Sequence, residues 1–400
     1  MILLAGASVV LPGAVLRPGW VGVSGGTIAA VGEGGPPAAD GAVVDLGGGY
    51  LLPGYVDLHV HGGGGGSIDA SPEGLAAAVA THRSHGTTRT LASVVTAPVE
   101  AMADAVRRIA AAVHAGPTPD GHVVGAHLEG PFLARERAGA QNPEAIIDPD
   151  PRVLQRLLDA AGGTARMVTV APELPGAIDV IRAVVDAGAV AAIGHTDATY
   201  AQASAGIRAG ARVLTHAFNG TRPLHHREPG PVGAVLGRPD DAAVREVDVA
   251  GGGADVVAGV VAEAINDGIH LHDATLWLLH RCLGHRLCFV TDAMAAAGLG
   301  DGDYEFTGRT VTVRGGRASL AGNGVLVGST PMMDRPVARA VNEVGLPIEV
   351  AARAAATTPA GVLGGAGRFG AVAAGLDADL VVLDDDLAVR RVMALGRWVR

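Results

Sequence analysis

Residues 55–61 read Tyr55-Val56-Asp57-Leu58-His59-Val60-His61. The run is short and mainly apolar, which is typical of a buried β-strand, and two of its last three residues are histidines. Because residues two apart in a strand point to the same side, His59 and His61 can reach one metal ion. The glycine run 62–66 that follows would let the backbone approach a ligand closely. A lone His-x-His pair is nevertheless weak evidence, since ordinary core and surface histidines are common.

Seven more runs of strand character follow the first, with helical stretches between them. The expected strands are Tyr55–Val60, Thr88–Val95, His122–Leu128, Arg166–Ala171, Ala189–Gly194, Ala211–His216, Val256–Ile265 and Arg286–Thr291. The helices between them include Pro72–His85, Pro98–Ala115, Pro151–Ala161 and Thr199–Ala209. Several begin at proline, which suits the first turn of a helix. Eight strands alternating with helices predict a parallel (β/α)₈ barrel.

The two ends of the chain have a different pattern from the middle. Residues 1–52 contain short β-like runs separated by glycine and proline, and residues 366–400 repeat this pattern. Runs of this composition that end at turn residues predict strands rather than helices. We expect both ends to form one small β-sandwich domain beside a barrel of residues 53–365.

The composition restricts the possible functions. Of the 400 residues, 48% are hydrophobic and 18% are charged, which is typical of a soluble globular protein. The net charge of −10 argues against the basic face that nucleic-acid binding needs. No apolar run reaches membrane-spanning length without glycine, proline or a charge. Two cysteines, Cys282 and Cys288, are too few for a disulfide framework and fit a cytoplasmic protein.

Lysine is absent, so all 30 positively charged side chains are arginines. This excludes Schiff-base chemistry, a P-loop lysine and a carbamylated lysine that bridges two metal ions. A bridge between two ions would have to come from a carboxylate or from solvent.

Polar residues stand where the predicted strands end, on the face where barrels build active sites. Taken singly, each has an ordinary explanation, because a buried histidine can bond a backbone carbonyl. A carboxylate that ends an apolar strand, however, needs a cation or several donors. Several imidazoles with one carboxylate suit Zn²⁺ or a similar ion. We therefore expect one or two divalent ions, with Zn²⁺ favoured, bound by His59, His61, Glu129, His195 and His216.

Asp292 follows the last predicted strand and has no ligand role to fill. A carboxylate beside a metal site can take a proton from water and deliver it to a leaving amine. We expect Asp292 to be this catalytic base, although the residue could instead cap a helix or stand in a turn.

The loop after His216 offers groups that could bind phosphate. It contains an Asn219-Gly220 turn with free backbone amides, and it also carries Arg222 and Arg227. The next strand end contributes Asp267-Gly268-Ile269-His270. Without the metal motif, a solvated loop would be the preferred interpretation.

Together these residues resemble the N-acetylglucosamine-6-phosphate deacetylases of the amidohydrolase superfamily. The resemblance extends through nearly the whole chain, and its most specific motifs are His127-Leu128-Glu129-Gly130-Pro131 and Arg227-Glu228-Pro229-Gly230. Further matching segments are Pro53–His61, Gly194–Ala198, Thr215–His216, Asp267–His270, Thr291–Ala293, Gly328–Thr330 and Ala378–Val382.

The resemblance implies metal-dependent removal of the acyl group from an N-acetyl amino-sugar 6-phosphate, most specifically the glucosamine compound. It implies one metal bound by Glu129, His195 and His216, a second held through His59 and His61, and Asp292 as catalytic residue. It also implies a homodimer. The residues implied to grip the sugar phosphate are Asn219, Gly220, Arg227 and His270.

Two departures from the family pattern bear on the substrate. Relatives usually have a histidine just before Asn142, where this chain has Gln141. A glutamine amide can donate a hydrogen bond to the substrate carbonyl but cannot carry a positive charge. The segment Val244–Gly253 is also longer than the family pattern. The galacto epimer therefore stays open as a substrate.

Two rival functions remain at this stage. One is another amidohydrolase, such as a Glu-bridged aminoacylase, which would not depend on phosphate. The other is a non-catalytic barrel that binds a sugar phosphate as a sensor. The second is disfavoured because a binding module needs no base beside its metal.

Overall fold

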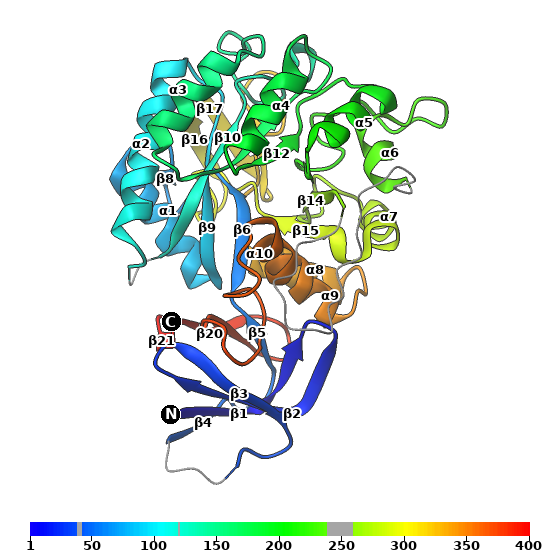
Figure 1. Cartoon of the computed structure of the whole chain (residues 1–400). Helices are drawn as coiled ribbons and strands as arrows, with labels where there is room; N and C mark the ends of the chain where they lie inside the picture. Colours follow the sequence, from blue (N-terminus) through cyan, green and yellow to red (C-terminus); the bar gives the residue numbers. More distant parts are fainter. Residues whose placement is uncertain (38–41, 119–120, 238–258) are drawn as a thin grey trace.

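A computed structural model describes residues 1–37, 42–118, 121–237 and 259–400 of the chain. Its centre is a sheet of eight parallel strands in which the neighbours follow the sequence order, as Figure 1 shows. The strands are β6 (Tyr55–Val60), β9 (Thr87–Val94), β10 (Val123–Glu129), β11 (Ala165–Val170), β12 (Val190–Ile193), β13 (Val213–Leu214), β14 (Val261–Ile265) and β15 (Leu287–Val290). Beyond the strand ends, an isolated bridge between Val60 and Ala293 joins the first strand to the last. The expected barrel is confirmed.

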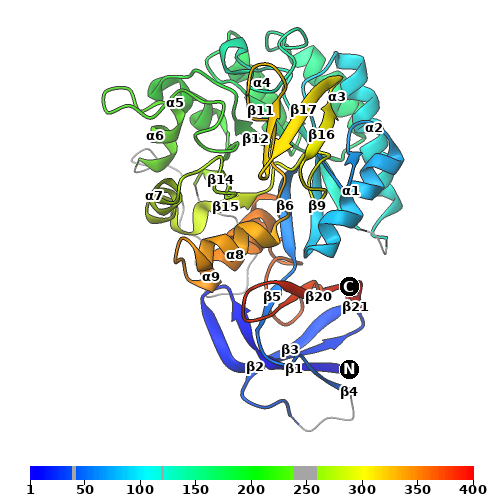
Figure 2. The ribbon, with the colours of Figure 1, turned by 180° about the vertical axis from the view of Figure 1, so that it is seen from behind.

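Helices between the strands cover the outside of the barrel (Figures 1 and 2). Their first turns show why they begin where they do: Ser71 accepts a hydrogen bond from Gly74 N at 3.0 Å, and Pro72 occupies the first turn of α1. These helices are α1 (Pro72–Ser84), α2 (Val99–Ala115), α3 (Pro151–Ala161), α4 (Ala177–Asp186), α5 (Tyr200–Ala209), α6 (Gly230–Leu236) and α7 (Asp273–Leu283). After the last strand come α8 (Asp334–Asn342), α9 (Ile348–Ala352) and α10 (Thr358–Val362). No helix in the described ranges has the length and apolar character needed to cross a membrane.

A second sheet combines both ends of the chain below the barrel in the view of Figure 1. Its strand order is β21-β20-β19-β5-β1-β2-β3, and β4 pairs with β1. The N-terminal members are β1 (Ile2–Leu11), β2 (Ala14–Ser24), β3 (Thr27–Glu33), β4 (Ala42–Asp45) and β5 (Tyr50–Pro53). The C-terminal members are β19 (Leu380–Leu383), β20 (Val389–Ala394) and β21 (Arg397–Trp398). The expected small β-domain built from both ends is confirmed, whereas the domain boundaries after residues 52 and 365 stay predictions.

Several elements differ from the sequence prediction. The sixth strand ends at Leu214 rather than at His216, whose backbone has a positive φ of 28° that takes it out of the extended conformation. The seventh strand is β14, and the earlier part of its predicted range, like the long segment 244–253, reaches into residues outside the described ranges.

A three-stranded antiparallel sheet was not expected from the sequence. It consists of β16 (Gly302–Phe306), β17 (Arg309–Arg314) and β18 (Arg317–Leu320), and it is inserted between β15 and α8. Figure 2 shows β16 and β17 beside the barrel. This insertion supplies part of the wall of the candidate active site.

Candidate active site

Five buried side chains meet at the C-terminal ends of the barrel strands. Two groups of ligand atoms each lie within 4.8 Å of one another: those of His59, His61 and Glu129, and those of Glu129, His195 and His216. Each of the five residues is at most 6% exposed. We call these five residues the metal-ligand cluster. The structure therefore brings together every ligand predicted from the sequence.

In the first group, His59 lies in β6, His61 directly follows that strand, and Glu129 ends β10. The two imidazoles approach each other at 3.0 Å between their Nε2 atoms. His59 Nε2 lies 3.4 Å from Glu129 Oε1, and His61 Nε2 lies 3.3 Å from Glu129 Oε2. Both carboxylate oxygens thus face the histidines of the first strand.

The second group follows β12 and β13. His195 Nε2 and His216 Nε2 lie 3.1 and 3.0 Å from Glu129 Oε1, and 3.2 Å from each other. Glu129 therefore lies between the two pairs of histidines, where its carboxylate could bridge two ions. In a chain without lysine, a carboxylate in this position is one of the two groups, with solvent, that could form such a bridge.

In three of the histidines, a hydrogen bond at Nδ1 fixes the orientation of the ring and directs Nε2 toward the other members of the cluster. His195 Nδ1 lies 2.8 Å from Arg137 O, and His216 Nδ1 lies 3.1 Å from Asn219 O. Because a carbonyl oxygen only accepts, both Nδ1 atoms carry the proton and both Nε2 lone pairs are free for a metal. His59 Nδ1 lies 3.2 Å from Glu263 Oε2 in the same way. This arrangement is typical of histidines that bind a metal.

Glu263 contacts the metal-ligand cluster but is not among the residues predicted from the sequence. It lies in β14 and is fully buried. Besides His59, its Oε2 accepts a hydrogen bond from His216 N at 3.1 Å, so it contacts one ligand from each group. A signal was available, since a carboxylate inside an apolar predicted strand needs donors for the same reason that Glu129 does.

Asp292 lies next to the first group of ligands. Its Oδ1 is 3.3 Å from His61 Nε2 and 3.6 Å from His59 Nε2. The backbone there has a positive φ of 50°, and it is held by hydrogen bonds from Asp292 N to His59 O and from Ser329 N to Asp292 O, at 2.8 and 2.7 Å. No helix begins at Asp292, so the alternative role as a helix cap is wrong.

The charges of the site keep both carboxylates ionised. Burial raises the pKa of Glu129, but the charges of His59 and the hydrogen bonds of His195 and His216 outweigh it and hold the pKa well below its ordinary value. For Asp292, burial is again opposed by the two histidines of β6, which lower the pKa to about 2. These pKa values hold while the imidazoles are protonated; a divalent cation would displace the Nε2 protons and supply the positive charge that keeps the carboxylates ionised.

A cavity of about 260 Å³ opens beside the metal-ligand cluster, and we call it the site cavity. Predicted residues that line it are His61, Glu129, Gln141, His195, His216, Asn219, Gly220, His270 and Asp292. Gln141 is held there because its Oε1 accepts from Thr96 N at 2.8 Å while its amide nitrogen donates to Glu129. His270 is oriented by Asp267, whose Oδ2 lies 2.7 Å from the ring Nδ1.

Neither arginine of the loop after His216 lines the site cavity. Arg222 is bound to Asp197, with 2.5 Å between Nη2 and Oδ2. Arg227 is exposed, and its Nη1 lies 2.8 Å from His226 Nε2. The phosphate-binding roles of Arg227, Asn219, Gly220 and His270 all stay predictions, although the last three line the site cavity.

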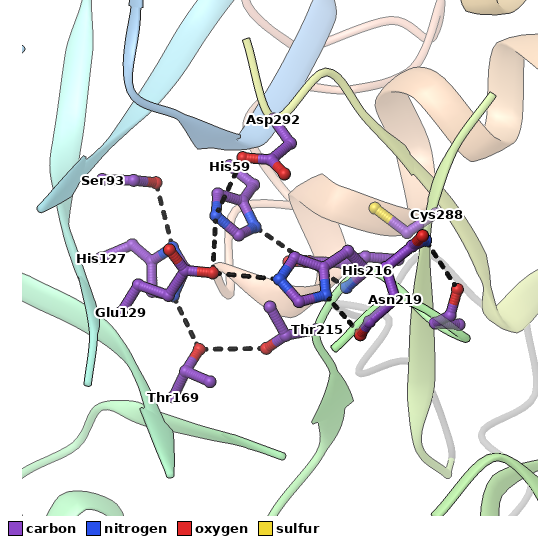
Figure 3. A network of polar contacts seen from close by, with 12 residues as sticks. His59, Ser93, His127, Glu129, Thr169, Thr215, His216, Asn219, Cys288 and Asp292 are labelled. Atoms are coloured by element: carbon purple, nitrogen blue, oxygen red, sulfur yellow. Dashed lines mark hydrogen bonds and ion pairs between the residues drawn. The ribbon is translucent and has the colours of Figure 1, made fainter. Parts of the chain in front are cut away.

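His127 packs against the metal-ligand cluster but is not a member of it. Its Nδ1 lies 3.0 Å from Ser93 Oγ and its Nε2 lies 2.8 Å from Thr169 Oγ1, which in turn lies 3.0 Å from Thr215 Oγ1 (Figure 3). Its ring packs edge-on against His59 at 4.7 Å between centroids. With both nitrogens occupied, His127 packs beneath a ligand rather than acting as one.

The profile of the amidohydrolase family matches residues 50–399, which include the metal-ligand cluster and Asp292. The chain belongs to the amidohydrolase family. It is therefore a hydrolase that acts on an amide bond.

Solved structures and characterised relatives resemble this amidohydrolase over most of their length. The crystal structure of N-acetyl-D-glucosamine-6-phosphate deacetylase from Mycobacterium smegmatis has a TM-score of 0.89 and 42% sequence identity, and the match covers 100% of both chains. N-acetylglucosamine-6-phosphate deacetylase from Bos taurus is 36% identical over 89% of this chain and 84% of its own length. N-acetylgalactosamine-6-phosphate deacetylase from Escherichia coli O157:H7 is 35% identical, and the match covers 87% of each chain.

The family implies a divalent metal, and the residues present fit one. Several Nε2 atoms with free lone pairs surround one carboxylate within hydrogen-bond range of each other. Without a cation, this would be a costly concentration of buried polar groups. Imidazole nitrogen together with carboxylate oxygen is a donor set that suits Zn²⁺ and similar ions.

Proposed function

We propose that this amidohydrolase removes the acetyl group from N-acetylglucosamine 6-phosphate, giving glucosamine 6-phosphate and acetate. The observation that carries the proposal is the position of Asp292, which is 3.3 Å from a histidine of the metal-ligand cluster and lines the same cavity as Asn219, Gly220 and His270. Relatives that are N-acetylglucosamine-6-phosphate deacetylases support it, including a Mycobacterium smegmatis variant solved in complex with N-acetyl-D-glucosamine 6-phosphate.

The proposed cofactor is Zn²⁺, as one or two ions. Glu129, His195 and His216 would hold one ion, and His59 and His61 with Glu129 a second. When bound, a zinc ion polarises an amide carbonyl and lowers the pKa of water from near 16 to about 7.

In the proposed reaction, Asp292 moves the proton. Its ionised carboxylate takes a proton from the attacking water as the carbon–oxygen bond forms. It then gives that proton to the amide nitrogen as the carbon–nitrogen bond breaks, which restores the carboxylate and releases acetic acid and the amine. The acid loses its remaining proton to the amine or to water and leaves as acetate. The Gln141 amide has two hydrogens, and one is donated to Glu129. The other can be donated to the acetyl carbonyl.

The proposed phosphate site uses the loops after β13 and β14. The backbone amides of the Asn219-Gly220 turn and the ring of His270 would bind the phosphate oxygens, with Arg227 adding a positive charge from the exposed part of the loop. The Asn219-Gly220 turn follows β13, which lies four strands from β9 in either direction around the eight-stranded barrel, so the phosphate held by this turn would lie across the mouth from β9.

N-acetylgalactosamine 6-phosphate is a second candidate substrate. It is favoured by the N-acetylgalactosamine-6-phosphate deacetylase among the relatives and by Gln141, which replaces the usual histidine of the glucosamine enzymes. The two substrates differ only in one hydroxyl configuration.

One assay tests the function. Purified protein with Zn²⁺ restored is given the gluco compound, its galacto epimer and both unphosphorylated sugars, and acetate release is measured. We expect the gluco compound to be the best substrate and the unphosphorylated sugars to be poor.

An Arg227→Ala protein with unchanged kcat/KM would show that Arg227 is not part of the phosphate site. Equal turnover with and without phosphate would favour an aminoacylase-like enzyme instead. Elemental analysis of the purified protein tests the proposed zinc. The mass in solution tests whether the enzyme, which we propose to be cytoplasmic, is a homodimer.

A further inference from the structure

A second cavity, of about 970 Å³, adjoins the site cavity, and we call it the side cavity. Among the described lining residues, the two that line both cavities are His61 and Phe306. Phe306 is the last residue of β16, and its ring meets that of His61 edge-on at 6.5 Å between centroids. The Phe306 ring therefore stands between the two spaces, next to a predicted metal ligand.

In the proposed orientation of the substrate, its acyl end points toward Phe306. Of the proposed phosphate donors, the Asn219-Gly220 turn follows β13, which lies opposite β9 in the eight-stranded barrel, and the side cavity lies over the ends of β6 and β9. The amide carbon has to lie beside His61 and Asp292. A molecule that reaches from the phosphate donors to these residues presents its acyl group to the Phe306 ring.

The side cavity has the chemistry to accept an uncharged chain. Part of its wall is apolar and buried, with Val94, Val95 and Met102 at most 3% exposed. Carboxylates also line it, at Asp69 and Glu73. These carboxylates would repel an acyl group that carries a negative charge, although Arg108 also lines this cavity.

We propose that Phe306 sets the length of the acyl group that this amidohydrolase removes, by separating the acetyl position from the side cavity. The proposal rests on the proposed function, because it assumes an acyl-sugar phosphate as substrate. With phenylalanine present, the acetyl group fits and a longer chain meets the ring. With the ring removed, the two cavities join, and a butyryl or hexanoyl chain can extend along Val94, Val95 and Met102.

The experiment compares kcat/KM for the N-acetyl, N-butyryl and N-hexanoyl forms of glucosamine 6-phosphate. We expect the wild-type protein to prefer acetyl. In Phe306→Ala, the ratio of butyryl to acetyl should rise by about tenfold or more, since steric pockets discriminate a methylene by roughly that factor. Phe306→Leu should show a smaller rise and serves if the alanine protein is unstable. Tyr304→Ala is the matched control, because Tyr304 belongs to the same strand but lines only the side cavity.

The outcomes separate the two proposals. If the wild-type protein releases no acetate from the N-acetyl substrate, the proposed function fails. If it does release acetate but both Phe306 variants keep the wild-type butyryl-to-acetyl ratio, the role of Phe306 is overturned. An equal rise of KM for all three acyl groups would also overturn it, because it would place the ring against the sugar. A raised ratio in Tyr304→Ala would assign the selectivity to the hairpin as a whole.

Discussion

At the scale of single residues, the proton-transfer role depends on Asp292. Asn at this position keeps the size of the side chain but cannot accept a proton. We expect Asp292→Asn to lower kcat by a factor of about 10² to 10⁴ while metal content stays at the wild-type level. Asp303→Asn, which changes an exposed aspartate of β16, is the control and should keep full activity. Near-normal turnover by a metal-loaded Asp292→Asn protein would contradict the role.

Glu263 is expected to act on the metal through His59. Gln keeps an oxygen that can accept from His59 Nδ1, but it removes the negative charge that makes the ring a better ligand. We expect Glu263→Gln to weaken Zn²⁺ binding about 10- to 100-fold, measured by competition with a chelator and by the absorption spectrum of the Co²⁺-substituted protein. Glu173→Gln is the control, because Glu173 bonds Thr196 and Asp197 N and contacts no imidazole of the cluster. Equal affinities in the two variants would leave Glu263 with a structural role only.

The ligand residues could be predicted from the sequence, but their backbone geometry could not. Histidine or aspartate directly after an apolar run predicts a strand-end position, and His195, His216 and Asp292 do follow barrel strands, each two residues after the last strand residue. All three have positive φ values, of 45°, 28° and 50°. Such conformations cost non-glycine residues of order 1–3 kcal/mol and persist only where surrounding contacts fix them. Those contacts come from distant segments, such as Ser329 on Asp292, and a local sequence pattern carries no information about them.

At the scale of elements, alternation of strands and helices was enough to predict the barrel, because each buried parallel strand is a nearly continuous apolar run. The sheet of β16, β17 and β18 was missed for the opposite reason. Most residues of this sheet are exposed or half-buried, and in Gly302–Phe306 none is buried. Such strands resemble loop sequence. Phe306 was therefore not considered, although it lines the site cavity.

In the glycine loop after β6, close approach of other backbone atoms leaves no room for a side chain at Gly62. A Cβ atom on Gly62 would lie 2.5 Å from Gly66 O and 2.7 Å from Ala295 N, and backbone atoms cannot move aside as a flexible side chain can. We expect Gly62→Ala to lower the free energy of unfolding by about 1–3 kcal/mol and to reduce metal content, because His61 precedes the loop. Gly13→Ala is the control, since nothing lies within 4 Å of its added Cβ. Wild-type metal content in Gly62→Ala would show that the loop does not position His61.

At the scale of the whole molecule, both ends of the chain were predicted to meet, but the link between the small sheet and the barrel was not. That link includes Arg89 of β9, which is 1% exposed. Its Nε donates to Asp379 Oδ2 at 2.8 Å, and its Nη2 lies 2.5 Å from Asp377 Oδ2. The guanidinium also lies over the Phe369 ring at 4.7 Å. These partners are nearly 300 residues away in sequence, so charge patterning alone could not pair them.

Removing this buried arginine should destabilise the entire fold without altering the chemistry. In Arg89→Met, the carboxylate of Asp379, itself 3% exposed, would lose its cation and stay buried. Breaking a buried pair in this way costs about 3–5 kcal/mol. Urea unfolding should show a loss of this size, while kcat of the folded protein stays unchanged, since Arg89 lies toward the start of β9 and the metal-ligand cluster lies at the opposite end of the barrel strands. The matched control is Arg107→Met, whose exposed pair with Asp104 is worth about 0–1 kcal/mol. Equal losses in the two variants would mean that water reaches Asp379 and that the small sheet is held to the barrel mainly by its apolar contacts.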